Sequence, residues 1–412
     1  MPDQPLRRAL DKLIAAALRA ADPREAIRRH AQIAGEVLRI DHQQYDLAQF
    51  DEVRVLSAGK AAVPMAEQVF TLLGSRITRA VVVTKYGHAL TPSQHQSLIP
   101  LIPLIIEAGH PIPDENSQRA GEAFCEALQG CTERTLVIAC VSGGASALLI
   151  APQEGISLNT LRAINAALLR SGADIHEMNA VRSRLDRLKA GGLVRMAQPA
   201  TVISLILSDV IGDPLHVIAS GLTNEPHAHN VLVGNNTQSC NAVAGAAREL
   251  GFTAHVVTTE LRGEARDAGA RIAHDLLAPS ALADGQRTTG VRCLVYGGET
   301  TVTLQGNGKG GRNQELALAA AMALNRRDIQ PNAPAYAVAA LGTDGTDGPT
   351  DAAGAFAFDD TIQRAQVADL DPGDFLLRND SYHFFQALND LIVTGPTGTN
   401  VADVAIALAA EP

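Results

Sequence analysis

The sequence predicts an α/β protein with two different domains. Short runs rich in β-branched residues alternate with longer Ala- and Leu-rich stretches, which is the pattern of α/β folds. A length of 412 residues exceeds what one hydrophobic core usually supports, so two domains are expected. Several predicted strands end in glycine-rich loops, and ligands of open α/β sheets bind beyond the carboxyl ends of strands.

The first half of the chain holds one series of predicted strands, at residues 53–56, 80–84, 135–141 and 201–207. Ahead of them, apolar residues at helical spacing predict an amphipathic helix packed on the body of the protein: Leu10, Leu13, Ile14, Ala17 and Leu18.

A second series of strands is predicted to begin near Val231 and to continue at residues 253–257, 291–296, 336–341 and 391–394. A further β-run is predicted at 301–304. The boundary is therefore expected between Asn224 and Asn230, which gives domains of residues 1–228 and 229–412.

Composition restricts the class of partner. The formal net charge of −10 disfavours a general nucleic-acid or anionic-membrane surface, and 3% aromatic residues without tryptophan leave little for base stacking. The five cysteines show no CxxC pair, which fits free thiols in a reducing compartment. The apolar stretch 13–18 is too short to span a membrane, and no signal peptide is recognisable. We therefore expect a cytoplasmic protein that binds small molecules.

The loop of residues 306–312 is the first candidate site. It lies between the predicted β-run and a helix predicted from Asn313 to Leu324, so its N–H groups could meet an anion at a helix start. Lys309 and Arg312 would add positive charge. The candidates for phosphate binding in and beside this loop are Gly308, Lys309, Gly310, Gly311 and Asn313.

The loop of residues 342–348 is the second candidate. Asp344 and Asp347 supply the carboxylate oxygens that Mg²⁺ prefers. A phosphate site beside a magnesium site suggests phosphoryl transfer. Any single loop of this kind is as typical of a plain turn as of a binding site, but two such loops after consecutive strands favour function.

Three loops in the first half carry further candidates. Lys60 follows the first strand and opens a helix, where a ligand-binding lysine and a solvated one are about equally expected. Asp209 follows the strand at 201–207, where it could orient a hydroxyl or hold a metal. Small residues that permit close backbone approach to a substrate or phosphate complete the set: Ser57, Gly59, Ser142, Gly143, Gly144 and Ser146.

Two other features have ordinary interpretations. Residues 177–189 predict a helix with a basic face, and such faces are usually solvated. Gly306, Gly308 and Gly311 satisfy the GxGxxG spacing of dinucleotide sites, but no acidic residue is clearly placed about 20 residues later for a ribose.

Taken together, nine segments resemble the class II glycerate kinases, the glycerate 2-kinase family whose C-terminal module is the MOFRL domain and whose members are often named hydroxypyruvate reductases. In the first half these are Ser57–Ala62, Val83–His88, Glu107–Asp114 and Ser142–Leu149. In the second half they are Gly297–Thr301, Gly310–Glu315, Gly342–Gly354, Asn379–Tyr382 and Thr394–Asn400.

The resemblance implies a Rossmann-like N-terminal domain, a C-terminal α/β domain containing the MOFRL module at about 290–408, and an active site in the interdomain cleft. It implies ATP- and Mg²⁺-dependent phosphorylation of D-glycerate on its 2-hydroxyl, which yields 2-phosphoglycerate. The family's catalytic residues correspond to Lys60, Asp209 and Arg312. A monomer or a homodimer is expected.

Two alternatives stay open at this stage. An NAD(P)H-dependent hydroxypyruvate reductase would use the GxGxxG loop, although no loop shows the histidine and carboxylate pair expected beside a substrate arginine. A non-catalytic sensor of sugar acids or nucleotides would keep the pocket without turnover.

Overall fold

The computed structural model describes residues 5–89, 104–171, 175–278, 291–325 and 334–410, and it divides into two compact units. We call Asp22–Asn235 with Gly398–Asn400 the parallel-sheet unit. We call Met1–Ala21, Asn236–Thr397 and Val401–Pro412 the mixed-sheet unit.

The parallel-sheet unit contains a six-stranded sheet in the order β6-β5-β4-β7-β8-β9, and all neighbouring strands are parallel. In chain order the strands are β4 (Glu52–Ala58), β5 (Ile77–Lys85), β6 (Ile105–Ala108), β7 (Thr135–Ser142), β8 (Thr201–Leu207) and β9 (Ala228–Gly234). This is the strand order of the dinucleotide-binding fold, in which the chain reverses direction between the first and fourth strands. The reversal here falls between β4 and β7.

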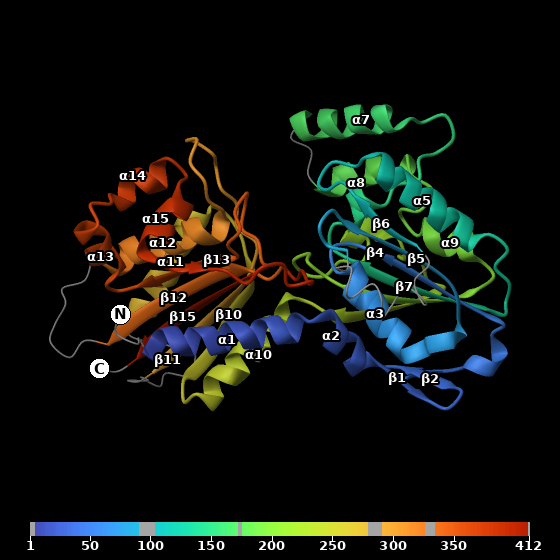
Figure 1. Cartoon of the computed structure of the whole chain (residues 1–412), viewed down its shortest axis with the longest axis horizontal. Coiled ribbons are helices and arrows are strands. Elements are labelled where there is room, and N and C mark those ends of the chain that lie inside the picture. Colours follow the sequence, from blue (N-terminus) through green and yellow to red (C-terminus); the bar gives the residue numbers. More distant parts are fainter. Residues whose placement is uncertain (1–4, 90–103, 172–174, 279–290, 326–333, 411–412) are drawn as a thin grey trace. The chain divides into compact units, whose positions relative to one another are not determined.

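Helices cover both faces of this sheet (Figure 1). On one face α3 (Ala62–Leu73) packs with α2 (Pro23–His30), and on the other α5 (Glu115–Leu128) packs with α9 (Gly192–Ala197). The remaining elements are α6 (Ala145–Leu148), α7 (Leu158–Ser171), α8 (Ile175–Arg184), three 3-10 turns η1 (Leu47–Gln49), η2 (Gly74–Arg76) and η3 (Ile218–Gly221), and a small antiparallel sheet of β1 (Ala31–Ala34), β2 (Val37–Ile40) and β3 (Gln43–Asp46).

The mixed-sheet unit has six strands in the order β10-β11-β15-β12-β13-β14, with only β10 and β11 paired in parallel. They are β10 (Thr253–Leu261), β11 (Arg292–Gly298), β12 (Ala335–Gly342), β13 (Gly354–Phe358), β14 (Leu391–Ile392) and β15 (Asp403–Ala410).

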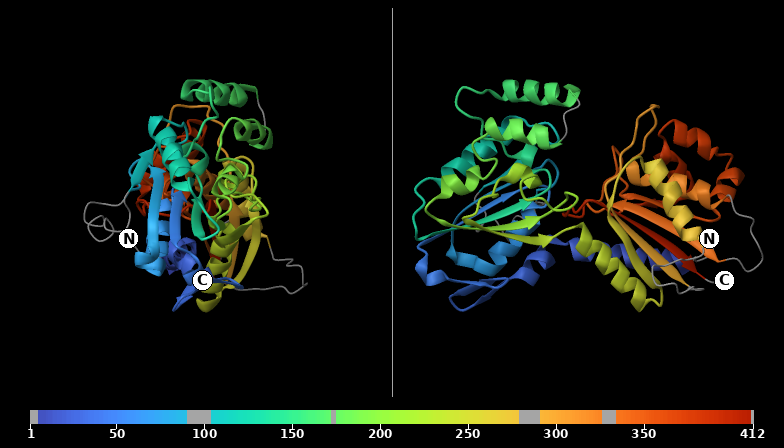
Figure 2. Two further views of the ribbon diagram at one scale, coloured as in Figure 1. Left: turned by 90° about the vertical axis from the view of Figure 1, so that its right-hand side faces the viewer. Right: turned by 180° about the vertical axis from the view of Figure 1, so that it is seen from behind.

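Alternate residues of this sheet enter two separate cores. In β12, Val338 and Ala340 face a core with helices α11 (Ala265–Leu277), α12 (Arg312–Leu324), α13 (Thr361–Val367), α14 (Pro372–Leu377) and α15 (Ser381–Leu388). Ala337 and Ala339 face the opposite core, with α1 (Pro5–Ala21) and α10 (Asn236–Glu249). Figure 2 shows the same two layers from behind. The alternation follows from the two-residue period of a strand.

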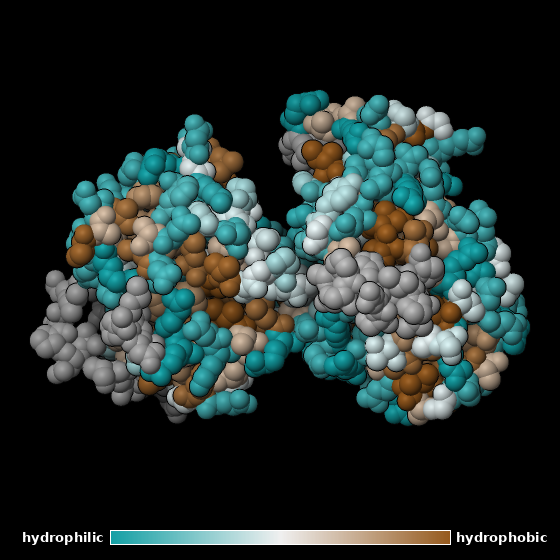
Figure 3. All heavy atoms as spheres, viewed as in Figure 1, coloured by the Kyte–Doolittle hydropathy of each residue, from teal (hydrophilic) through white to brown (hydrophobic). Residues whose placement is uncertain are grey.

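Among the residues that the structure describes, no helix is both long and apolar enough to span a membrane. Hydrophilic and hydrophobic side chains are interspersed on the face shown in Figure 3. Large exposed apolar residues such as Val37, Leu304 and Val367 are far apart in the sequence.

Most predicted elements are confirmed, and three expectations are corrected. Residues 301–304 form no strand, since only Thr301 makes an isolated bridge, to Glu264. The helix predicted over 177–189 ends at Arg184. The strand near Val231 is β9, which closes the first sheet instead of opening the second.

The two compact units therefore do not correspond to a simple division of the chain at residue 228. Helix α1 packs on the mixed sheet because Leu10, Leu13 and Ala17 are buried against residues of α10 and the sheet. Residues 398–400 belong to the parallel-sheet unit. No local sequence pattern predicts the packing of α1 on the mixed sheet or the membership of residues 398–400 in the parallel-sheet unit.

Candidate active site

The loops after β4 and β7 touch each other at the point where the strand order reverses. Gly59 has φ +128° and no room for a Cβ, which would overlap Ser142 Oγ. The Lys60 N–H donates to Gly143 O at 2.8 Å. Two candidate loops are thus joined at the carboxyl end of the sheet, where open α/β folds bind ligands.

The hydroxyl groups of Ser57 and Ser142 in these loops form hydrogen bonds with the backbone. Ser57 is fully buried and its hydroxyl donates to Ala62 O at 2.7 Å. Ser142 is also fully buried, and its Oγ accepts from the Ala61 N–H at 3.1 Å. Both hydroxyls therefore stabilise the turn that presents Lys60.

Asp209 lies directly against the glycine loop. Its carboxylate occupies the space that a Cβ at Gly143 would need, so any larger residue there would displace Asp209. The Asn400 amide donates to Asp209 Oδ2 at 2.8 Å. The carboxylate is therefore held from two sides, by backbone packing and by a neutral hydrogen-bond donor.

Lys60 and His110 border the next glycine. Gly144 has φ +85°, and a Cβ there would lie 3.3 Å from Lys60 Cγ and 3.2 Å from His110 Cδ2. Two residues further along the chain, Ser146 Oγ lies 2.9 Å from Ser220 Oγ. The Asp209 carboxylate, the Lys60 side chain and the His110 ring thus all border the Gly143–Ser146 loop at one edge of the sheet, and side chains of these types suit proton transfer and anion binding.

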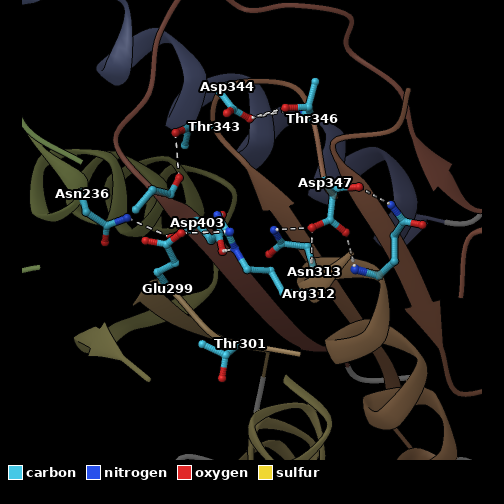
Figure 4. Close-up of polar contacts among 12 residues, drawn as sticks. Asn236, Glu299, Thr301, Arg312, Asn313, Thr343, Asp344, Thr346, Asp347 and Asp403 are labelled. Carbon is cyan, nitrogen blue, oxygen red and sulfur yellow. Dashed lines mark hydrogen bonds and ion pairs between the residues drawn. The ribbon is translucent and has the colours of Figure 1, made fainter. Parts of the chain in front are cut away.

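In the mixed-sheet unit Arg312 is fixed by two carboxylates (Figure 4). Its Nε and Nη2 donate to the two oxygens of Asp403, the latter at 3.0 Å, and Nη1 lies 2.9 Å from Glu299 Oε1. Burial by itself lowers the pKa of Arg312, but the bonds to Asp403 outweigh it and the pKa is raised. The guanidinium is a permanent, oriented cation with 34% of its side chain exposed.

Asp347 caps helix α12, contrary to its expected availability as a metal ligand. Its carboxylate accepts from the N–H groups of Asn313 at 3.1 Å and Gln314 at 2.9 Å. Only 2% of Asp347 is exposed, and burial raises its pKa to about 7 even though both N–H bonds oppose that shift. A neighbouring Asp403 charge raises the pKa further, and Arg312 lowers it.

The second predicted metal ligand also has local partners. Asp344 Oδ1 accepts from the Thr346 N–H and hydroxyl, each at 3.0 Å, which closes an Asx turn (Figure 4). Within the described ranges no group of three or more His, Cys, Asp or Glu could hold a metal ion. Asp344 and Asp347 thus belong to no such three-residue group, and Mg²⁺ binding by either of them stays a prediction.

Several backbone N–H groups at the start of the 306–312 loop donate within the protein, and the binding of an anion by this loop stays a prediction. The Gln305 and Gly306 N–H groups donate to Asn379 Oδ1 at 2.8 and 3.0 Å. Those of Gly308 and Lys309 donate to Arg378 O and Asp380 Oδ1, each at 2.9 Å.

The glycines of this loop allow neighbouring segments of the chain to pack closely against it. A Cβ on Gly308, Gly310 or Gly311 would overlap Asp380, Ser381 or Asp347, respectively. Gly306 and Gly308 thus pack on the turn before α15 and Gly311 packs on Asp347, and the N–H groups of Gly306 and Lys309 are bonded within the protein and not open to a dinucleotide pyrophosphate. The Lys309 ammonium lies 4.1 Å from the centre of the Tyr382 ring.

Sequence reasoning misses the partners that orient the predicted residues. Asn400 lies in a segment that the sequence marks only by its family resemblance, and Asp403 begins the last strand without any motif. Both are distant in sequence from Asp209 and Arg312, so only the folded chain pairs them.

Comparisons with known proteins agree with this architecture. Residues 9–235 match a domain of unknown function (DUF4147), and residues 292–403 match the MOFRL family. A D-glycerate 2-kinase from Thermotoga maritima is 39% identical, covering 87% of this chain and 91% of that protein. A protein from Agrobacterium vitis provisionally named hydroxypyruvate reductase is 37% identical, covering 85% and 97%.

The structural comparison covers almost the whole chain. A crystal structure of glycerate kinase from Thermotoga maritima matches with a TM-score of 0.85 and 34% identity, covering 98% of this chain and 99% of that one. The fold and its loops define a two-domain α/β protein that joins a DUF4147 region to a MOFRL region. The chain belongs to the glycerate 2-kinase family.

Proposed function

We propose that this protein transfers the γ-phosphoryl group of ATP to the 2-hydroxyl of D-glycerate, giving 2-phosphoglycerate and ADP. The observation that carries the proposal is the placement of Asp209 and Lys60, from two different loops, against the glycine loop that follows β7. Membership of the glycerate 2-kinase family supports the substrate and the site of phosphorylation.

Asp209 is assigned the role of orienting the 2-hydroxyl and accepting its proton. As the hydroxyl oxygen forms its bond to the γ-phosphorus, the bond from phosphorus to the bridging oxygen breaks and ADP leaves. Enzymes of this class depend mainly on positioning and on charge stabilisation. The contacts of Asp209 with Gly143 and Asn400 supply the positioning, and Lys60 supplies positive charge.

Arg312 and Lys309 are assigned the role of stabilising the negative charge of the ATP phosphates. Their side chains are given this role because the N–H groups of Gly308 and Lys309 are bonded within the protein. Arg312 is suited to it because two carboxylates fix the guanidinium while part of it stays exposed.

Mg²⁺ would arrive with ATP. Magnesium in kinases commonly binds substrate phosphates with few protein ligands, and Asp344 and Asp347 do not fit a protein cage. All five cysteines are free thiols, which supports a cytoplasmic location as part of this proposal.

Product analysis tests the proposal. Purified protein is incubated with D-glycerate, ATP and Mg²⁺, and the products are resolved by ³¹P NMR. Formation of ADP and 2-phosphoglycerate is expected. A parallel reaction with hydroxypyruvate and NAD(P)H tests the reductase: cofactor oxidation without ATP turnover would overturn the kinase assignment.

A further inference from the structure

A pocket in the parallel-sheet unit has a cationic lining that the assigned catalytic roles do not use. It is bordered by Pro111, by Ser146 of the short helix α6, and by Arg182, Asp186 and Lys189 at and beyond the end of α8. The sequence predicts a solvated basic face here. The structure instead turns part of that face inward.

Lys189 is the most buried cation of this pocket. Only 5% of it is exposed, its ammonium donates to Ser146 O at 3.0 Å, and it lies 3.6 Å from Asp186 Oδ2. Asp186 is itself 3% exposed and accepts from the Ala151 and Leu188 N–H groups at 3.0 and 2.9 Å. The Asp186 carboxylate is therefore shared between two backbone N–H donors and one ion pair with Lys189.

The lining residues that the structure describes carry more positive than negative charge. Among them Arg182 and Lys189 are the cations and Asp186 is the carboxylate. Burial lowers the pKa of Lys189, and the nearby Arg182 lowers it further against the opposing effect of Asp186. Two cations beside one anion in a partly enclosed site are stabilised by a further anion.

The backbone around Lys189 is held in unfavourable conformations. Ala190, Ala219 and Ser220 have φ of +47°, +50° and +55°, a left-handed region that is unfavourable for a residue with a Cβ. The Ala190 N–H donates to Ser220 O at 2.9 Å. Strain of this kind persists where surrounding structure enforces it, and it concentrates at binding sites.

The pocket adjoins the proposed phosphorylation site through shared residues. Ser146 lines the pocket and belongs to the same loop as Gly143, against which the Asp209 carboxylate packs. Pro111 lines it and follows His110, which borders Gly144. In a 2-hydroxy acid the hydroxyl and the carboxylate are on adjacent carbon atoms, so the two groups need two such neighbouring subsites.

We propose that Lys189 and Arg182 form the subsite that binds the carboxylate of the hydroxy-acid substrate, while its 2-hydroxyl faces Asp209. The inference rests on the proposed function, because it names the groups that select the substrate of that reaction. It makes the enzyme specific for hydroxy acids over uncharged polyols such as glycerol.

Steady-state kinetics of the full-length Arg182→Gln and Lys189→Met variants test the subsite. Arg184→Gln is the matched control, because Arg184 is an exposed arginine on the same helix. Loss of a charged hydrogen bond predicts a rise of about 10- to 100-fold in KM for D-glycerate in both variants. KM for ATP should change little, and Arg184→Gln should match the wild type.

An unchanged KM for D-glycerate in Arg182→Gln, or an equal rise in KM for ATP, would overturn the proposal. Thermal melting checks that each variant folds. If Lys189→Met does not fold, the decision rests on Arg182→Gln, whose side chain is less buried than Lys189.

Calorimetry without ATP separates this proposal from the proposed function. D-glycerate should bind the wild type, should bind Arg182→Gln at least about tenfold more weakly, and glycerol should not bind. If the wild type forms no 2-phosphoglycerate, the kinase assignment fails. The calorimetry then decides by itself whether the subsite binds the carboxylate of D-glycerate. Equal binding to both proteins, or none to the wild type, overturns the subsite.

Discussion

The side-chain amide of Asn400 donates to Asp209 Oδ2 across 2.8 Å, joining a residue near the end of the chain to the loop that follows β8. Asn400 is 8% exposed and belongs to the three-residue segment that packs with the parallel-sheet unit. Because the donor is neutral, it fixes one carboxylate oxygen without cancelling the negative charge that a proton acceptor needs.

Asn400→Ala should therefore lower kcat by about 10- to 100-fold, because small displacements of a reacting group are costly. KM for ATP should change little, since Asp209 is assigned to the hydroxyl. The control is Asn241→Ala, which replaces an exposed asparagine of α10. Equal kcat in both variants would remove the positioning role of Asn400.

Gly143→Ala tests whether the glycine loop sets the position of Asp209. An added Cβ would overlap the Asp209 carboxylate, so that side chain must move and kcat should fall by about 100-fold. Gly245→Ala is the matched control, because Gly245 lies within α10 and a Cβ added there would meet nothing within 4 Å. That change should keep activity and slightly stabilise the helix.

A double-mutant cycle of Arg312 and Asp403 separates catalysis from stability. Arg312→Ala leaves the buried Asp403 carboxylate without its donor, so it should cost about 1–3 kcal/mol of unfolding free energy as well as about 100- to 1,000-fold in kcat. Adding Asp403→Asn should recover much of the stability and none of the activity. Recovery of turnover by the double variant would show that Arg312 acts only as a counterion.

How far the sequence predicts this protein can be judged from particular elements. The strand at 201–207 and the helix that ends at Leu324 are predicted almost to the residue, because apolar runs bounded by turn residues are local signals. The edge position of β9 and the packing of α1 on the second sheet are not predicted, since both depend on contacts between distant segments.

The site shows the same limit. Lys60, Asp209 and Arg312 follow or open predicted elements, so their positions could be inferred. The segments that pack against the glycine loop at 306–311 are not predicted, because a sequence does not show which distant residues a glycine makes room for. Here the glycines make room for Asp380, Ser381 and Asp347.

Asp347 should make the protein less stable as pH rises through the neutral range. Burial raises the pKa of this group from 3.8 to about 7, so between these values the folded state binds more protons than the unfolded state. The free energy of unfolding then falls with rising pH. Asp347→Asn keeps an acceptor for the helix N–H groups and stays neutral, so urea unfolding at pH 5 and pH 8 should differ less than in the wild type.

The control for this measurement is Asp267→Asn, an exposed aspartate in the first turn of α11, which should keep the wild-type pH dependence. An identical difference between pH 5 and pH 8 in Asp347→Asn and wild type would contradict a protonation at Asp347 linked to folding.

Asp344→Asn tests whether the loop at 342–348 holds magnesium. In the structure Asp344 Oδ1 accepts from the Thr346 N–H and hydroxyl, and an asparagine oxygen could accept the same bonds. We therefore expect the Mg²⁺ concentration for half-maximal activity to change by less than about twofold, since phosphate-bound Mg²⁺ needs few protein ligands. A rise of about tenfold or more, with ATP held in excess and normal thermal melting, would instead make Asp344 a metal ligand.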